Sequence, residues 1–156
     1  MSGKTPYLRH GLVAGAVGTT ALNAATYLDM AARGRPSSST PEQTVQRLTQ
    51  LLGFTVPGDD DGRHARESGL GSLLGIAAGT GAGLALGALR RSGWPRGRAA
   101  TLTVAFALAM AAGNGPMTAL GVTDPRTWSA SSWLSDVVPH AAYAVAAAAT
   151  LHAFDR

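Results

Sequence analysis

The stretch of residues 71–91, GSLLGIAAGTGAGLALGALRR, carries a glycine at every fourth position. These glycines are Gly71, Gly75, Gly79, Gly83 and Gly87. In an aqueous helix each of them costs about 1 kcal/mol relative to alanine. In a bilayer, lipid tails are as apolar as leucine, so helices associate through close packing of small residues rather than through the hydrophobic effect. The spacing therefore predicts a membrane-spanning helix with a shallow groove along one face.

Charged residues make up only 14% of the 156 residues, against about 25% in an ordinary soluble domain. Long windows without Asp, Glu, Lys or Arg lie at residues 10–28, 68–89, 99–123 and 137–154. A spanning helix needs about 20 predominantly apolar residues, with a range of about 17–25. We therefore predict an all-α fold, a four-transmembrane-helix bundle that forms one integral membrane domain over residues 1–156. Its predicted spans are residues 10–31, 69–90, 98–121 and 135–154.

Two alternatives to this topology stay open. A soluble, alanine-rich four-helix bundle would show a polar face with a period of 3.6 residues, and residues 69–89 have no charged face. A cleaved signal peptide would explain the first window, because basic residues precede an apolar run. That run is long and contains several polar residues, so it is a poor signal-peptide core.

The loop after the first predicted span contains a second, shorter helical pattern. Thr40 is a suitable N-cap, Pro41 suits the first helical position, and Gln43 completes a capping-box pattern. Together they predict a short amphipathic helix over residues 41–52, in the membrane interface or against the end of the bundle. The following PGDDDGR, residues 57–63, is predicted to be an exposed turn; its consecutive aspartates lack the alternate spacing of a calcium loop.

Basic residues indicate the orientation in the membrane. The loop RRSGWPRGR, residues 90–98, contains Arg90, Arg91, Arg96 and Arg98 and no acidic residue. Short basic loops stay in the cytoplasm, so both termini are predicted to be cytoplasmic and the protein to lie in the plasma membrane. The first loop conflicts with this orientation, because it would be outside although it also carries arginines. The arginines of both loops lie beside the spans rather than on a separate domain. We therefore expect them to contact anionic lipid headgroups, and we expect no nucleic-acid partner. Tryptophans at predicted helix ends fit interface anchors: Trp94, Trp128 and Trp133.

Polar residues at membrane depth are the candidate functional residues, because burying them in lipid is expensive. Asp136, His140 and Tyr143 share one face of the last predicted span. The third span contains Asn114 within AAGNGPM, and we predict a kink near residues 113–116 because Pro116 has no N–H to donate. Asn23 lies in the first span, and these five residues are predicted to share one polar pocket. In the alternative, Asp136 only caps its helix and His140 only makes a structural hydrogen bond.

The first span repeats the small-residue pattern with Gly11, Gly15 and Gly18, so the first and second spans are predicted to pack closely. In the alternative, the glycine face lines an oligomer or a pore. The chain has no cysteine, and no nucleophile motif, phosphate loop or metal-ligand spacing is present, so no cofactor is expected.

Two segments carry a family resemblance: TYLDMAARGRPSSSTPE, residues 26–42, and LGVTDPRTWSASSWLSDVVPHAAY, residues 120–143. They resemble small four-helix membrane proteins of high-GC actinobacteria that have no assigned activity. The resemblance covers nearly the whole chain and implies no catalytic residues.

The sequence favours a non-enzymatic membrane protein that acts through helix packing, as an accessory subunit of a membrane protein partner or as a homo-oligomeric scaffold. The alternative is a small proton-coupled transporter or channel that uses Asp136, His140 and Asn114. A membrane enzyme acting on lipid is a third hypothesis, with Asp136 and His140 as its only acid–base pair.

Overall fold

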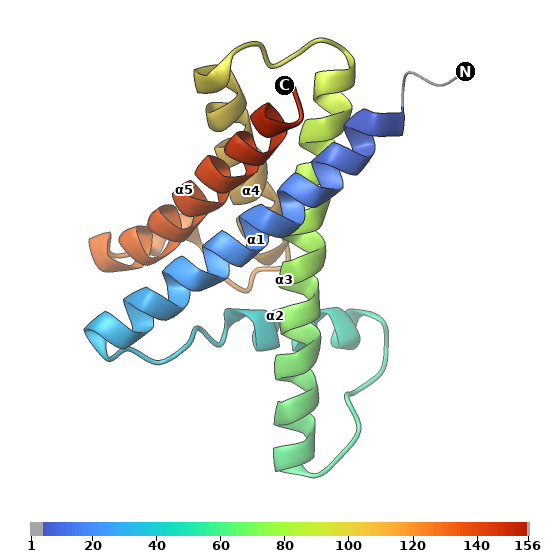
Figure 1. Ribbon diagram of the computed structural model, residues 1–156. Helices are drawn as coiled ribbons and strands as arrows, with labels where there is room; N and C mark the ends of the chain where they lie inside the picture. The colour runs from blue at the N-terminus through green and yellow to red at the C-terminus, as the bar shows by residue number, and fades with distance from the viewer. Residues whose placement is uncertain (1–4, 156) are drawn as a thin grey trace.

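The computed structural model describes residues 5–155, and within that range the chain forms α-helices, one short 3-10 helix and loops, with no strand (Figure 1). The elements are α1 (Thr5–Arg33), α2 (Thr40–Leu51), α3 (Asp60–Arg91), α4 (Arg98–Ala119), η1 (Pro125–Thr127) and α5 (Ala130–Ala153). In this range three helices, α3, α4 and α5, are long and apolar enough to cross a membrane. The all-α prediction is confirmed. The predicted first span, residues 10–31, is a helix of sufficient length but not one of these three, and polar residues such as Thr19, Thr20 and Asn23 interrupt its apolar stretch.

Helix α3 begins at Asp60 rather than at the predicted residue 69. Asp59 caps it, because its Oδ1 accepts a hydrogen bond from the Gly62 N–H at 3.0 Å. Asp60 and Asp61 then occupy the first turn, where negative charge is favoured by the helix dipole. The prediction of an exposed turn through residue 63 is therefore wrong from Asp60 onward, and the consecutive aspartates instead start a helix.

Helix α5 also begins earlier than predicted, at Ala130 rather than at residue 135. Ser129 is its N-cap, with its Oγ accepting from the Ser132 N–H at 3.1 Å. Asp136 therefore does not cap this helix, and Pro139 lies in its interior instead of its first turn. The earlier start moves His140 away from the end of the helix.

Helix α4 follows its predicted start but ends at Ala119 rather than at residue 121. It is continuous through residues 113–116, so Pro116 does not break it. Gly121, with φ of +69°, follows the end of the helix, in the left-handed region that favours glycine.

Helix α2 corresponds to the amphipathic helix predicted at residues 41–52 and lies crosswise against the first half of α3 (Figure 1). Its N-cap is Ser39 rather than Thr40, and the Gln43 side chain reaches the Ser39 hydroxyl at 3.0 Å. Gly53, with φ of +76°, follows the end of the helix. Val45 is buried against α3, together with the neighbouring threonines of the same face.

Helices α1 and α5 run side by side and cross α3 obliquely, and the start of α1 and the end of α5 lie at the same end of the molecule (Figure 1). The His10 ring of α1 stacks on Phe154 at a centroid distance of 4.2 Å. Arg90 at the end of α3 pairs with Asp155 at 2.6 Å. At the opposite end Arg33 of α1 reaches Ser131 of α5 at 3.0 Å. These contacts make α1 antiparallel to both α3 and α5.

The interior consists mainly of small residues contributed by four helices. The buried cluster comprises Ala14, Ala82, Leu86, Ala105, Ala109, Tyr143, Ala144, Ala147 and Leu151. Large apolar side chains lie outside instead, including Leu12 (46% exposed), Leu73 (61%) and Val145 (57%). Small residues inside and large apolar residues outside suit a lipid surround, where close helix contact stabilises the fold more than burial of large side chains.

Candidate functional site

The closest helix contact joins α1 and α3 through glycine. A Cβ added to Gly83 would collide with the Gly15 Cα and stand 2.5 Å from the Gly11 carbonyl oxygen. A Cβ on Gly87 would stand 2.9 Å from the Gly11 Cα. The two backbones thus touch directly, and a side chain at either position would separate them.

The remaining glycines of the stripe have different neighbours. Gly79 faces the Thr19 side chain of α1, whereas a Cβ on Gly71 would stand 2.8 Å from Pro41 of α2. Gly75 has nothing within 4 Å of an added Cβ. Four residues advance a helix by about 40° more than one turn, so over the four steps from Gly71 to Gly87 the five glycines cannot all face a single partner. The predicted groove is therefore divided between α1, α2 and an open position.

Tyr143 of α5 connects three helices. It is only 1% exposed, and its hydroxyl donates to the Gly79 carbonyl of α3 at 2.7 Å. A Cβ added to Gly18 of α1 would stand 2.7 Å from the Tyr143 ring, so Gly18 provides the space for that ring. Gly18 thus faces α5 rather than α3.

Asn114, Asp136 and His140, here called the polar triad, lie together between α4 and α5. The Asn114 amide donates to Asp136 Oδ2 at 2.9 Å. His140 Nδ1 lies 2.7 Å from the Asp136 carbonyl oxygen and 3.5 Å from Asp136 Oδ1. A backbone carbonyl can only accept, so Nδ1 carries the hydrogen and Nε2 of the neutral ring is left with a lone pair.

His140 is only 9% exposed and lies ten residues, about 15 Å, from the start of α5 at Ala130. Its Nε2 lies 3.1 Å from where a Cβ on Gly113 of α4 would stand. Because Gly113 has no side chain, the imidazole can pack directly against the α4 backbone.

The other two predicted pocket residues lie differently. Tyr143 is one turn beyond His140 and bonds to α3 rather than to the polar triad. Asn23 of α1 is half-buried, and among the hydrogen bonds of residues 5–155 none joins it to Asn114, Asp136 or His140. The structure thus brings together three of the five.

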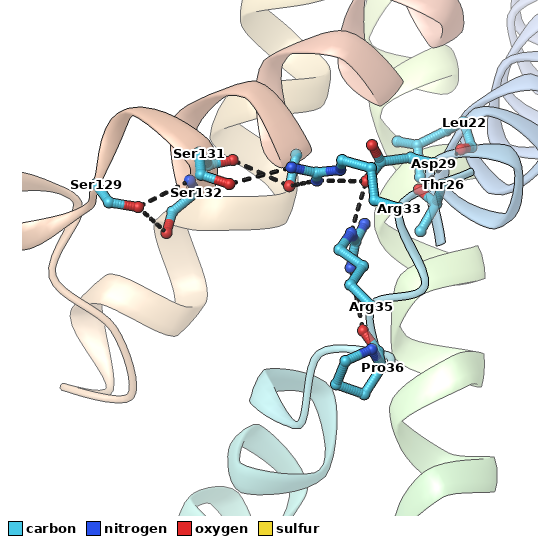
Figure 2. Close-up of polar contacts among 10 residues, drawn as sticks. Leu22, Thr26, Asp29, Arg33, Arg35, Pro36, Ser129, Ser131 and Ser132 are labelled. Carbon is cyan, nitrogen blue, oxygen red and sulfur yellow. Dashed lines mark hydrogen bonds and ion pairs between the residues drawn. The ribbon is translucent and has the colours of Figure 1, made fainter. Parts of the chain in front are cut away.

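A second polar cluster, here called the α1–α5 clasp, comprises Asp29, Arg33, Arg35, Ser131 and Ser135 (Figure 2). Arg33 pairs with Asp29 at 2.7 Å, and Arg35 Nε lies 2.5 Å from the same carboxylate. Arg33 also donates to the Ser131 hydroxyl at 3.0 Å and to that of Ser135. The four-residue spacing indicates the first ion pair, but no sequence signal relates Arg33 to serines about a hundred positions away.

The arginines of the basic loop differ in their contacts. Arg90 pairs with Asp155, Arg96 Nε donates to the Gly93 carbonyl at 3.0 Å, and Arg91, Arg96 and Arg98 are exposed. Trp94 is 51% exposed in the same loop.

Near the other end of α5, Trp133 (39% exposed) packs edge-on against Trp128 at 4.9 Å. The Trp128 indole N–H donates to the Thr123 hydroxyl at 2.8 Å. In the same loop, hydrogen bonds from Arg126 hold the pKa of Asp124 below its ordinary value. These contacts order the connection between α4 and α5.

Among residues 5–155 no three His, Asp or Glu side chains lie close enough to hold a metal ion. No protein-family model matches the chain, and neither a curated protein nor a solved structure matches it. The resemblance to actinobacterial membrane proteins therefore stays a prediction.

Proposed function

We propose that the chain is an integral plasma-membrane protein with four spans, in which α1 is the span additional to α3, α4 and α5. The support is geometric: α1 lies against α3 and α5 and is antiparallel to both, so a bilayer that surrounds those helices also surrounds α1. Most of its outward side chains between residues 12 and 28 are apolar, including Leu12 (46% exposed) and Val17 (41%), and Thr20 is the polar exception. Four crossings place both termini on one side, and the exposed arginines of residues 91–98 favour the cytoplasmic side.

We further propose that the protein acts by association, as an accessory subunit or a homo-oligomeric scaffold, rather than by catalysis. The observation that carries this proposal is the middle of α3, where each of residues 72–77, here called the open segment, is exposed. Apart from Ser72 the segment is apolar, with Leu73 61% and Ile76 48% exposed, and Gly75 leaves a notch at its centre. An apolar groove of about 400 Å³ between α2 and α3 adjoins the segment and includes Leu73. A partner helix can approach most closely at such a notch.

Replacing Gly75 with leucine is expected to reduce assembly at least about fivefold, because overpacking a tight contact costs about 1–3 kcal/mol. The measurement is native mass spectrometry after purification from native membranes in mild detergent, which identifies a co-purified partner or counts copies of the chain. Gly81 provides the matched control, since it also has nothing within 4 Å of an added Cβ but lies on a different face of α3. Assembly that Gly75→Leu leaves unchanged, or that Gly81→Leu reduces equally, would contradict the proposal.

A second candidate function, proton-coupled transport, is supported by the contact of Asn114 with Asp136 and His140 across α4 and α5. Replacing His140 with alanine is expected to abolish the pH dependence of flux, because it removes the only histidine of the triad. The measurement is flux of protons and small cations into liposomes containing the purified protein. The control is His64→Ala, at an exposed position in the first turns of α3. Flux that responds to pH equally in both variants would reject this candidate.

A further inference from the structure

The polar triad contains a proton acceptor at the contact between two helices. Nδ1 of His140 is committed to the Asp136 carbonyl at 2.7 Å, so a proton can bind only at Nε2. That atom faces α4 at Gly113, where an added Cβ would stand 3.1 Å away. The neutral ring thus presents an unpaired lone pair to the α4 backbone.

On the α4 side of this contact, Pro116 leaves one carbonyl without its usual partner. The carbonyl of residue i in an α-helix accepts from the N–H of residue i+4, so the partner of Ala112 would be residue 116. Residue 116 is proline and has no N–H. Ala112 is half-buried against the helix core and directly precedes Gly113. A carbonyl left unpaired at membrane depth is costly and favours any donor that can reach it.

We propose that His140 Nε2 is a proton-binding atom between α4 and α5, and that the protonated ring donates to the Ala112 carbonyl that Pro116 leaves free. Proton uptake then adds a hydrogen bond between the two helices and strengthens their contact. The inference rests on the polar site of the second candidate function, but it requires neither transport nor assembly.

Few ionisable groups surround His140. On α5, Asp136 Oδ1 lies 3.5 Å from Nδ1 and Tyr143 lies one turn further on. Helix α4 contributes Asn114 and has no charged residue after Arg98, and α3 has none between residues 68 and 89. On α1, Asp29 and Arg33 lie in the clasp at the start of α5, where Arg33 contacts Ser135 rather than Asp136. Asp136 is therefore the ionisable group that faces the ring most closely.

The test is ¹⁵N NMR of the full chain labelled at histidine, in lipid nanodiscs, with His140→Gln used to assign the His140 signals. At high pH the ring should carry its hydrogen on Nδ1, and Nε2 should gain a proton as the pH falls. In Pro116→Ala the restored N–H occupies the Ala112 carbonyl, so the midpoint of the His140 titration should fall by at least about 0.5 pH unit, or about threefold in the proton-binding constant. In Asp136→Asn the midpoint should fall as well, through loss of the negative charge.

The signals of His10, His64 and His152 provide internal controls, and their titrations should not move in Pro116→Ala. A hydrogen on Nε2 at high pH, or an unchanged His140 midpoint in Pro116→Ala, would overturn the proposal. If the unmodified protein shows no flux in liposomes but His140 titrates as expected by NMR, the transport function is rejected and the proton site is retained. Exchange of proline for alanine inside a helix removes a steric conflict, so this variant is expected to fold.

Discussion

Replacing Gly83 with leucine is expected to separate α1 from α3, with a cost above about 3 kcal/mol, beyond the usual range for overpacking. An added Cβ at this position already collides with the Gly15 Cα and lies 2.5 Å from the Gly11 carbonyl. The obstructing atoms belong to backbone, so no rotamer change relieves the collision and the helices must move apart. The individual helices keep their hydrogen bonds in lipid, so helix content by circular dichroism should stay nearly unchanged.

The measurement that reports this separation is the distance between spin labels on α1 and α3. The chain has no cysteine, so single cysteines at exposed Val17 and Leu84 can be labelled without background. The matched control is Gly75→Leu, which adds the same side chain where nothing lies within 4 Å. In the purified monomer the control should change stability by less than about 0.5 kcal/mol. A distance distribution in Gly83→Leu equal to that of the unmodified protein would show that α1 and α3 do not meet through this glycine.

Replacing Tyr143 with alanine is expected to destabilise the fold by about 3 kcal/mol or more, because it leaves a cavity at the meeting point of three helices. Tyr143 is the largest fully buried side chain, and its ring fills the space that Gly18 leaves open. The loss should appear as a lower midpoint in a denaturing-detergent titration, monitored by the same α1–α3 distance.

Tyr143→Phe separates the ring from its hydroxyl. The hydroxyl donates to the Gly79 carbonyl at 2.7 Å, and this carbonyl also has the Gly83 N–H as its intrahelical partner. No buried acceptor is left unpaired, so the phenylalanine variant should lose only about 1 kcal/mol. Equal losses in the alanine and phenylalanine variants would mean that the hydrogen bond, rather than the packing of the ring, stabilises this position.

The ends of the helices were the least predictable part of the fold. Asp59 and Ser129 each start a helix well before the apolar stretch begins, because a side-chain cap and favourable first-turn residues extend a helix into polar sequence. Hydropathy identifies only the apolar part of each helix and not its polar first turns. The five extra residues at the start of α5, from Ala130 to Leu134, change the interpretation of the site, since they make His140 an interior rather than a terminal residue.

The candidate site was predictable where residues share one helix. The four-residue spacing of Asp29 with Arg33 corresponds to an ion pair, and that of Asp136 with His140 corresponds to a side-chain contact at 3.5 Å. Depth in the membrane alone suggested that Asn114 and Asn23 both join Asp136. Among the hydrogen bonds of residues 5–155, Asn114 reaches Asp136 and none joins Asn23 to the polar triad. Depth along a helix does not specify the direction in which a side chain points.

The sequence by itself determined that the chain is helical and that its helices pack through small residues. These properties follow from composition and from spacing within single helices, which are local. Only the tertiary structure decided that Gly83 meets Gly11 and Gly15, that Gly75 is open and that Arg33 reaches Ser131. A four-residue repeat drifts by about 40° per step, so the crossing of the helices selects which glycines touch a partner. That crossing is set by the packing of all the helices together, and no single segment encodes it.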